Sequence, residues 1–222
     1  MTALLRYQTA LLLRSQRWLP PVLLYVAFLA IGIRSGEPVL GALGYASAPL
    51  LPVTAWLVRT CLNQEPPAAR DVAAAAAGRT RVHLAAILAG TLGATVPGVA
   101  AVLVVTAASA PVGADGRTGV PLPSAALAGL ATAGVCVLLG AAVGALLTRP
   151  LLPGRAWSTA AVMAAVLLAL VTTGSPANHA LTALVTGNRT GAVPLPLLPL
   201  AAAAVLAAAA TALACRLTAV RE

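Results

Sequence analysis

The chain has 222 residues, of which 60% are hydrophobic and only 9% are charged, and its mean hydropathy is +0.94. A water-soluble domain carries about 25% charged residues, so this composition excludes a soluble globular protein and predicts an integral membrane protein. The net charge of +9 does not indicate binding to nucleic acid, because the basic residues stand singly or in small groups between apolar runs. All fourteen basic residues are arginine, which together with the high alanine, glycine and proline content is typical of a bacterial gene of high GC content.

Residues 1–17 precede the first long apolar run. On a helix of about 3.6 residues per turn, Leu4, Tyr7, Leu11 and Trp18 fall along one stripe. We expect an interfacial helix that lies on the inner leaflet of the membrane, with lipid as a partner. Its arginines are Arg6, Arg14 and Arg17. A cleaved signal peptide is the alternative, but no small-residue cleavage site follows the first apolar run, and further apolar runs come after it.

Six apolar runs are candidates for membrane spans. Their approximate ranges are residues 18–33, 39–58, 82–108, 123–148, 156–173 and 194–215. Pro49 and Pro52 in the second run and Pro97 in the third predict breaks or kinks, because proline removes a helical hydrogen bond. Gly140 and Gly144 in the fourth run would let another helix approach closely, although such a pair is expected by chance in a sequence this rich in glycine and alanine.

The arginines predict the orientation of these spans. Eleven of the fourteen stand before the first span or after the second, fourth and sixth. By the positive-inside rule, both termini and the loop of residues 59–81 are cytoplasmic. The predicted fold is therefore all-α: a single transmembrane domain over residues 1–222, with six transmembrane helices, N-in and C-in, in the cytoplasmic membrane of a bacterium. Between the fifth and sixth spans, residues 177–186 predict a short helix at the outer surface or dipping into the membrane.

The sequence lacks the residues that several functions need. Asp, Glu, Arg and Lys are missing from the six predicted spans, and His83 lies at the cytoplasmic entry of the third, whereas proton-coupled carriers and ion pumps need carboxylate or histidine side chains within the membrane. Nucleophile-elbow, zinc-protease and P-loop motifs are missing, and Cys61, Cys136 and Cys215 have no disulfide or metal-binding spacing. His83 and His179 belong to opposite sides of the membrane and cannot form a haem pair. We expect no enzymatic activity, cofactor or metal, and energy for any transport would come from another polypeptide.

The loop of residues 59–81 concentrates charge between two apolar runs. Glu65-Pro66-Pro67 predicts a helix start, an alanine-rich stretch forms the helix body, and Gly78 predicts its end. Its candidate functional residues are Glu65, Arg70, Asp71, Arg79 and Arg81. The simpler interpretation is an ordinary inter-span loop with positive-inside arginines. The concentration of both charge signs around one short helix favours an attachment site for a cytoplasmic partner.

At this loop the chain resembles a family, the six-span permease subunits of ABC-2 type ABC transporters, in particular small actinobacterial ones. The resemblance covers most of the chain and includes Asn63-Gln64-Glu65-Pro66, Arg70 and Gly78 of the loop. In that family this loop and the N-terminal helix dock onto a separate ATPase subunit. The resemblance therefore implies that Glu65, Arg70 and Asp71 are docking contacts, with Arg79 and Arg81 in support, and that residues 177–186 correspond to outer re-entrant helices.

The leading hypothesis is the permease subunit of an ATP-driven exporter, which forms a substrate path with a second copy or a sibling permease. Polar span residues that would line this path are Tyr45, Ser47, Thr54, Thr91, Thr95 and Thr132. The apolar spans favour a lipid-like or amphipathic substrate. The alternative is a non-transporting anchor or assembly subunit that recruits a cytoplasmic partner, and an intramembrane enzyme lacks the residues it would need.

Overall fold

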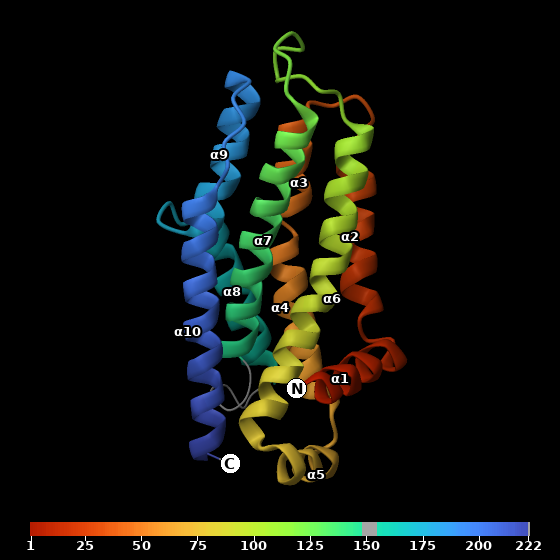
Figure 1. Ribbon diagram of the computed structural model, residues 1–222, viewed down its shortest axis with the longest axis vertical. Helices are drawn as coiled ribbons and strands as arrows, with labels where there is room; N and C mark the ends of the chain where they lie inside the picture. The colour runs from red at the N-terminus through yellow and green to blue at the C-terminus, as the bar shows by residue number, and fades with distance from the viewer. Residues whose placement is uncertain (148–154, 222) are drawn as a thin grey trace.

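The computed structural model describes residues 1–147 and 155–221, and these residues form an all-α bundle (Figure 1). In chain order the helices are α1 (Thr2–Ser15), α2 (Leu19–Gly32), α3 (Val39–Ser47), α4 (Leu50–Gln64), α5 (Pro67–Ala77), α6 (Arg79–Ala108), α7 (Leu122–Leu146), α8 (Arg155–Val171), α9 (Pro176–Thr190) and α10 (Leu197–Arg221). The N-terminal helix α1, the short helix α5 and the C-terminal part of α10 lie at the same end of the bundle (Figure 1). We call it the α5 end.

Several of the described helices are long and apolar enough to cross a membrane. Four segments meet this condition: Val39–Gln64 (α3 with α4), Arg79–Ala108, Leu122–Leu146 and Leu197–Thr218. Helices α8 and α9 meet it together as a pair bent by 44°, which would make a fifth span. Helix α2 is apolar but has only 14 residues. These lengths and compositions indicate a multi-pass membrane protein, and the sixth span and the orientation stay predictions.

The helix boundaries differ from the predicted spans mainly by extension. The break between α3 and α4 falls next to Pro49, as proline there predicts, whereas Pro97 is accommodated inside α6 without interrupting it. Helix α4 continues to Gln64, so residues 59–64 are helical and do not belong to a loop. Helix α6 begins at Arg79, and α10 runs to Arg221, beyond the predicted end at residue 215. Hydropathy marks where the apolar stretch ends, but a helix continues for as long as its backbone hydrogen bonds and packing favour it. The predicted end of the fourth span at Thr148 lies outside the described residues.

Close packing of α4 against α6 and α7 forms the centre of the bundle. A Cβ atom added at Gly90 of α6 would lie 2.6 Å from the Val58 Cα atom of α4, and one added at Gly144 of α7 would lie 2.8 Å from the Ala55 carbonyl oxygen. At Gly140 it would meet the Leu51 carbonyl oxygen. The pair Gly140 and Gly144 therefore does mediate a close helix approach, and glycine is required because the neighbour is backbone.

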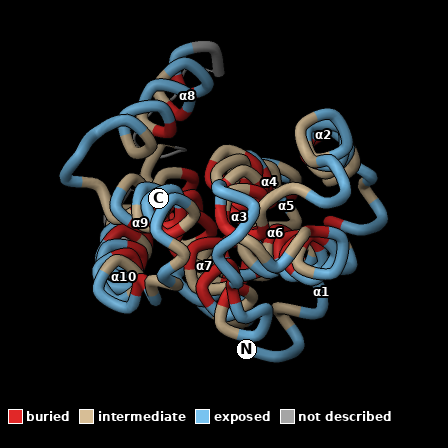
Figure 2. The backbone as a smooth tube through the Cα atoms, turned by 90° about the horizontal axis from the view of Figure 1, so that it is seen from above, coloured by how far each residue is buried: buried red, intermediate tan, exposed pale blue. Residues whose placement is uncertain are grey.

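Helices α2 and α8 lie at the periphery, separate from the packed centre when the bundle is seen along its long axis (Figure 2). Their outer faces are strongly apolar and exposed, with Ile31 of α2 81% and Trp157 of α8 78% accessible. Exposed apolar surface of this extent is unfavourable in water and favourable against lipid or another membrane helix. Helix α1 instead runs across the bundle axis and packs on α4 and α6 (Figure 1).

At the end opposite α5, backbone hydrogen bonds connect the loops to one another and to the last turn of α9. The Ala110 N–H donates to the Glu37 carbonyl oxygen at 2.9 Å, and the Ala114 N–H donates to the Asn188 carbonyl oxygen at 2.7 Å. Helix α9 begins where the Ser175 side chain accepts the Ala177 N–H at 3.3 Å and ends at Gly191, whose φ is 72°. The short helix predicted over residues 177–186 is thus present and longer than predicted.

Candidate functional site

Helix α5 is an exposed helix held between α4 and α6. Its predicted start and end are confirmed: Pro67 occupies the first turn, and Gly78, with a φ of 87°, ends the helix while its N–H donates to the Ala74 carbonyl oxygen at 2.8 Å. Proline fits the first turn because its missing N–H needs no partner there, and glycine tolerates a positive φ. None of the α5 residues is buried, and Val72 is 72% exposed.

The five charged residues predicted at this site divide into two groups. Asp71, Arg79 and Arg81 are exposed, the two arginines in the first turn of α6 and not in a loop. Glu65 is buried, with 7% of its surface accessible, and Arg70 is half-buried. The exposed group is free to contact a partner, whereas the other two side chains are used inside the chain.

Glu65 connects the α4–α5 junction to α1. Its Oε2 atom accepts a hydrogen bond of 3.1 Å from Nε2 of Gln8, a residue of α1 that is completely buried. Tyr7 lies beside the same carboxylate: desolvation first, and then the charge of Glu65 and a hydrogen bond to it, raise the pKa of Tyr7 above its usual value of 10.0. Burial of a carboxylate is energetically unfavourable unless hydrogen-bond donors satisfy it. Helix α1 supplies such a donor to Glu65, the amide of Gln8.

Arg70 connects α5 to α4. Its Nη2 atom donates to the carbonyl oxygen of Leu62, in the last turn of α4. The last carbonyl groups of a helix have no intrahelical donor and carry the negative end of the helix dipole. A guanidinium there supplies the missing donor and a favourable positive charge. Arg70 therefore fixes the angle between α4 and α5.

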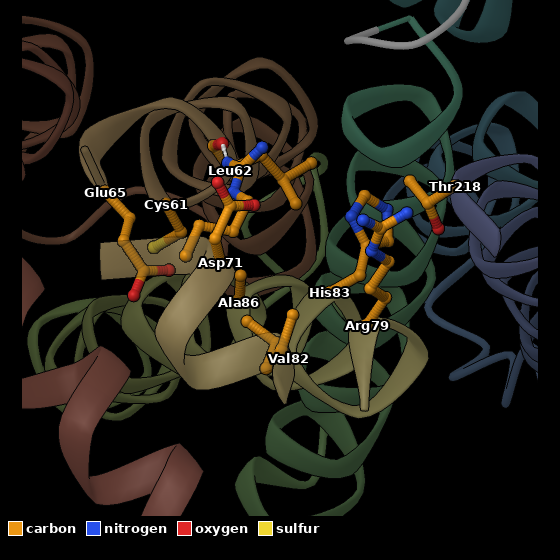
Figure 3. A pocket seen from close by; sticks show the side chains of 11 residues that line it. Cys61, Leu62, Glu65, Asp71, Arg79, Val82, His83, Ala86 and Thr218 are labelled. Carbon is orange, nitrogen blue, oxygen red and sulfur yellow. Dashed lines mark hydrogen bonds between the residues drawn. The ribbon is translucent and has the colours of Figure 1, made fainter. Parts of the chain in front are cut away.

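A small polar pocket lies beneath α5, where α4, α6 and α10 meet (Figure 3). Its volume of about 30 Å³ has room for one or two water molecules. Its lining includes Glu65, Arg70, Asp71, Arg79, His83 and Thr218. In the described residues, seven buried side-chain atoms have no hydrogen-bond partner, and five of them belong to Gln8, Gln64, Glu65 and His83 near this pocket. No group of three or more His, Cys, Asp or Glu side chains in the described residues is arranged to hold a metal ion.

The residues predicted to line a path use their hydroxyl groups within the chain. Ser47, Thr54 and Thr132 are completely buried, and each donates to the carbonyl oxygen four residues earlier, at 2.6–2.9 Å. Thr91 and Thr95 are half-buried and make the same kind of bond. The Tyr45 hydroxyl donates to the Phe28 carbonyl oxygen at 3.4 Å, and the two rings stack with centroids 4.4 Å apart. Their role in a path stays a prediction.

Helix α1 presents its arginines outward but buries a different stripe from the predicted one. Arg6 and Arg14 of α1, and Arg17 shortly after its end, are exposed. The buried residues of α1 are Gln8 and Leu12, whereas Tyr7 of the predicted stripe is 42% exposed. Sequence reasoning missed Gln8 because an amide in an amphipathic helix normally faces water. Its position one helical turn before Leu12 could have indicated that Gln8 shares the buried face of α1 with this leucine.

Comparisons with protein-family models, with curated proteins and with solved structures give no match for this chain. The fold class and the multi-pass character therefore follow from the helices themselves. The resemblance to ABC-2 permeases, which depends on the loop and the order of the spans, enters only as a proposal.

Proposed function

We propose that the chain is the membrane-spanning permease subunit of an ATP-driven exporter of the ABC-2 type, powered by a separate ATPase subunit. The observation that carries this proposal is α5, a helix without a buried residue that is fixed between two segments of membrane-spanning length, Val39–Gln64 (α3 with α4) and α6. Only residues 65–66 separate α5 from α4, and only Gly78 separates it from α6. A partner that pushed on α5 would therefore move both of these helices.

The exposed face of α5 supplies the docking surface in this proposal. Ala68, Val72, Ala75 and Ala76 are exposed and recur at helical spacing, which makes a shallow apolar stripe. Asp71 lies beside the stripe, and the exposed Arg79 and Arg81 follow its C-terminal end. This arrangement suits a groove on a partner protein with charges on its rim. Glu65 and Arg70 would act from behind this surface by holding α5 in position.

In the membrane, we propose six spans, with both termini and α5 on the cytoplasmic side. The distribution of arginines supports this orientation, and α1, α5 and the end of α10 share one end of the bundle (Figure 1). Helix α2 would be a short first span, α8 the fifth, and α9 a re-entrant helix at the outer side. The 44° bend between α8 and α9 is compatible with a broken span or with a re-entrant segment, and we propose the second.

A second permease copy would complete the path. Helices α2 and α8 lie on either side of α4 (Figure 2), and α4 carries Trp56, which is 47% exposed. Near the α5 end of the same side, Arg59 Nη1 donates to Thr159 Oγ1 of α8 at 2.7 Å. Two copies that faced each other through this side would enclose a largely apolar path, which suits a lipid-like or amphipathic substrate.

The test is to purify the chain under mild conditions with its co-purifying proteins and to measure ATP hydrolysis. We expect an ATPase subunit in the complex. The double variant Asp71→Arg with Arg81→Glu should lower its recovery and its activity about tenfold or more, because both exposed charges are reversed at a docking site. The matched control is Arg117→Glu, an exposed charge reversal in the loop at the opposite end, which should leave recovery unchanged. A complex without an ATPase would support the anchor or assembly alternative and refute the transporter.

A further inference from the structure

The contact between Gln8 and Glu65 joins two parts of the chain that are 57 residues apart. Gln8 belongs to α1, which packs across α4 and α6, and Glu65 is the first of the two residues between α4 and α5. Both side chains are buried, at 0% and 7% accessibility, although they lie at an end of the bundle where most of the polar residues are exposed.

The polar character of this contact is unusual for its surroundings. Around it, α1 and α4 meet through apolar residues, with Leu12, Val58, Cys61 and Leu62 in one buried cluster. A leucine in place of Gln8 would extend that cluster. The chain instead has an amide whose Nε2 donor is directed at Glu65 Oε2. A buried amide–carboxylate pair contributes little net stability but strongly penalises any arrangement that separates the partners.

The remaining polar atoms at this contact lie near the pocket beneath α5. Glu65 lines that pocket, and its Oε1 atom has no partner within the chain, as is also true of Oε1 of Gln8. The pocket has room for water, and water-mediated hydrogen bonds would lower the cost of holding the carboxylate inside. The hydrogen bond therefore fixes how Gln8 and Glu65 are oriented, while the carboxylate stays open to water in the pocket. Such a contact can keep its geometry when a force acts on α5.

We propose that Gln8 is a positioning residue for α5: through its hydrogen bond to Glu65, it couples α1 to the α4–α5 junction so that the two move as one body. A partner that engages α5 would then move α1 as well. The consequence for transport depends on the permease function proposed above, whereas the coupling itself is a property of this chain alone.

The first experiment uses the full chain alone in lipid nanodiscs and measures amide hydrogen exchange. Gln8→Leu keeps the side-chain volume but leaves the Glu65 carboxylate without its amide donor. We expect exchange to become about tenfold faster in α1 and also in α5, which corresponds to about 1.4 kcal/mol. Exchange in α7 should not change. The matched control is Gln16→Leu, which removes an exposed amide at the end of the same helix and should leave α5 unaffected.

A reciprocal exchange separates coupling from a simple packing defect. Gln8→Glu alone would bring two carboxylates together and should accelerate exchange in both helices. The double variant Gln8→Glu with Glu65→Gln restores one donor and one acceptor in reversed positions, and it should return exchange in α5 to within about twofold of the original value. Acceleration confined to α1 in Gln8→Leu, or no rescue by the double variant, would overturn the proposal.

The second measurement distinguishes the coupling from the proposed function. In the purified complex, Gln8→Leu should lower the rate of ATP hydrolysis while the ATPase subunit still co-purifies, because the docking face of α5 is intact. If no ATPase co-purifies but exchange in α5 responds to Gln8 as described, the transporter proposal fails and the coupling stands. If the ATPase is present and Gln8→Leu does not change exchange in α5, the coupling fails and the transporter proposal stands.

Discussion

In the middle of the bundle, α4 meets α6 and α7 backbone against backbone, whereas at the α5 end long polar side chains add to the apolar contacts between α4 and its neighbours. Gly90 and Gly144 leave no room for a Cβ atom between the helices. At the α5 end, Gln8 and Arg70 reach across to Glu65 and to the Leu62 carbonyl group. The first kind of contact fixes one helix separation, while the second tolerates small movements without losing its partner.

The two regions also differ in how their polar atoms are satisfied. In the middle, Ser47, Thr54 and Thr132 donate to carbonyl groups of their own helices and make no demand on neighbouring helices. Near the α5 pocket, five buried polar atoms have no partner among the described residues. Unsatisfied buried groups raise the free energy of one arrangement relative to others. The middle therefore has one closely packed arrangement, whereas the α5 end contains buried polar groups that a different arrangement could satisfy.

The largest effect on stability is expected from a substitution that disrupts the close packing of α4 against α7. Gly140→Ala would place a Cβ atom against the Leu51 carbonyl oxygen and the Thr54 Cβ atom, and backbone cannot move aside without shifting a helix. We expect the free energy of unfolding to fall by about 1–3 kcal/mol or more. Thermal unfolding in detergent would measure this as a lower melting temperature.

The matched control is Gly119→Ala in the loop at the opposite end, where an added Cβ atom would have nothing within 4 Å. Its melting temperature should remain close to that of the original chain. Equal melting temperatures for the two variants would contradict the close backbone packing of α4 on α7.

A smaller effect on stability should distinguish Arg70 from its neighbour Asp71 in α5. Arg70→Ala removes the donor to the Leu62 carbonyl group, and we expect a loss of about 1–2 kcal/mol in the local stability of the α4–α5 junction. Asp71→Ala removes an exposed side chain and should change stability by less than about 0.5 kcal/mol. Amide exchange in α5 measures both. If the two variants behaved alike on the isolated chain, Arg70 would not position α5.

The existence and limits of α5 could be predicted from the sequence because local residues determine them. Pro67 favours the first turn of a helix, and Gly78 adopts the positive φ that ends it. The break beside Pro49 follows from the same local chemistry. Pro97 shows the limit of this reasoning, since α6 continues through it, and packing of a long helix against α3, α4 and α7 can outweigh one missing hydrogen bond.

The inner part of the site could not be predicted because it depends on contacts between distant segments. Glu65 and Asp71 are both acidic residues near one helix start, but only Glu65 meets a buried donor, and that donor comes from α1. The charge pattern of the loop contains no information about where α1 will pack. The hydrophobic stripe of α1 was predicted one position away from the buried one, since Leu4, Leu5, Leu11, Leu12 and Leu13 offer several nearly equivalent faces.

The smallest effect on stability concerns Tyr7, whose pKa responds to the Glu65 carboxylate, and it depends on pH. Tyr7 has a pKa raised above 10.0 in the folded chain, by desolvation first and by Glu65 second, so the folded state favours the protonated hydroxyl. Its contribution to stability is complete below pH 10 and is lost as the pH rises through the higher folded-state pKa. Because Tyr7 is 42% exposed, the change should be small. Spectrophotometric titration of tyrosinate, taken as the difference between the original chain and Tyr7→Phe, should give a pKa above 10 that falls in Glu65→Gln. An unshifted value in the original chain would mean that Tyr7 does not share the carboxylate with Gln8, and that α1 holds the junction through Gln8 alone.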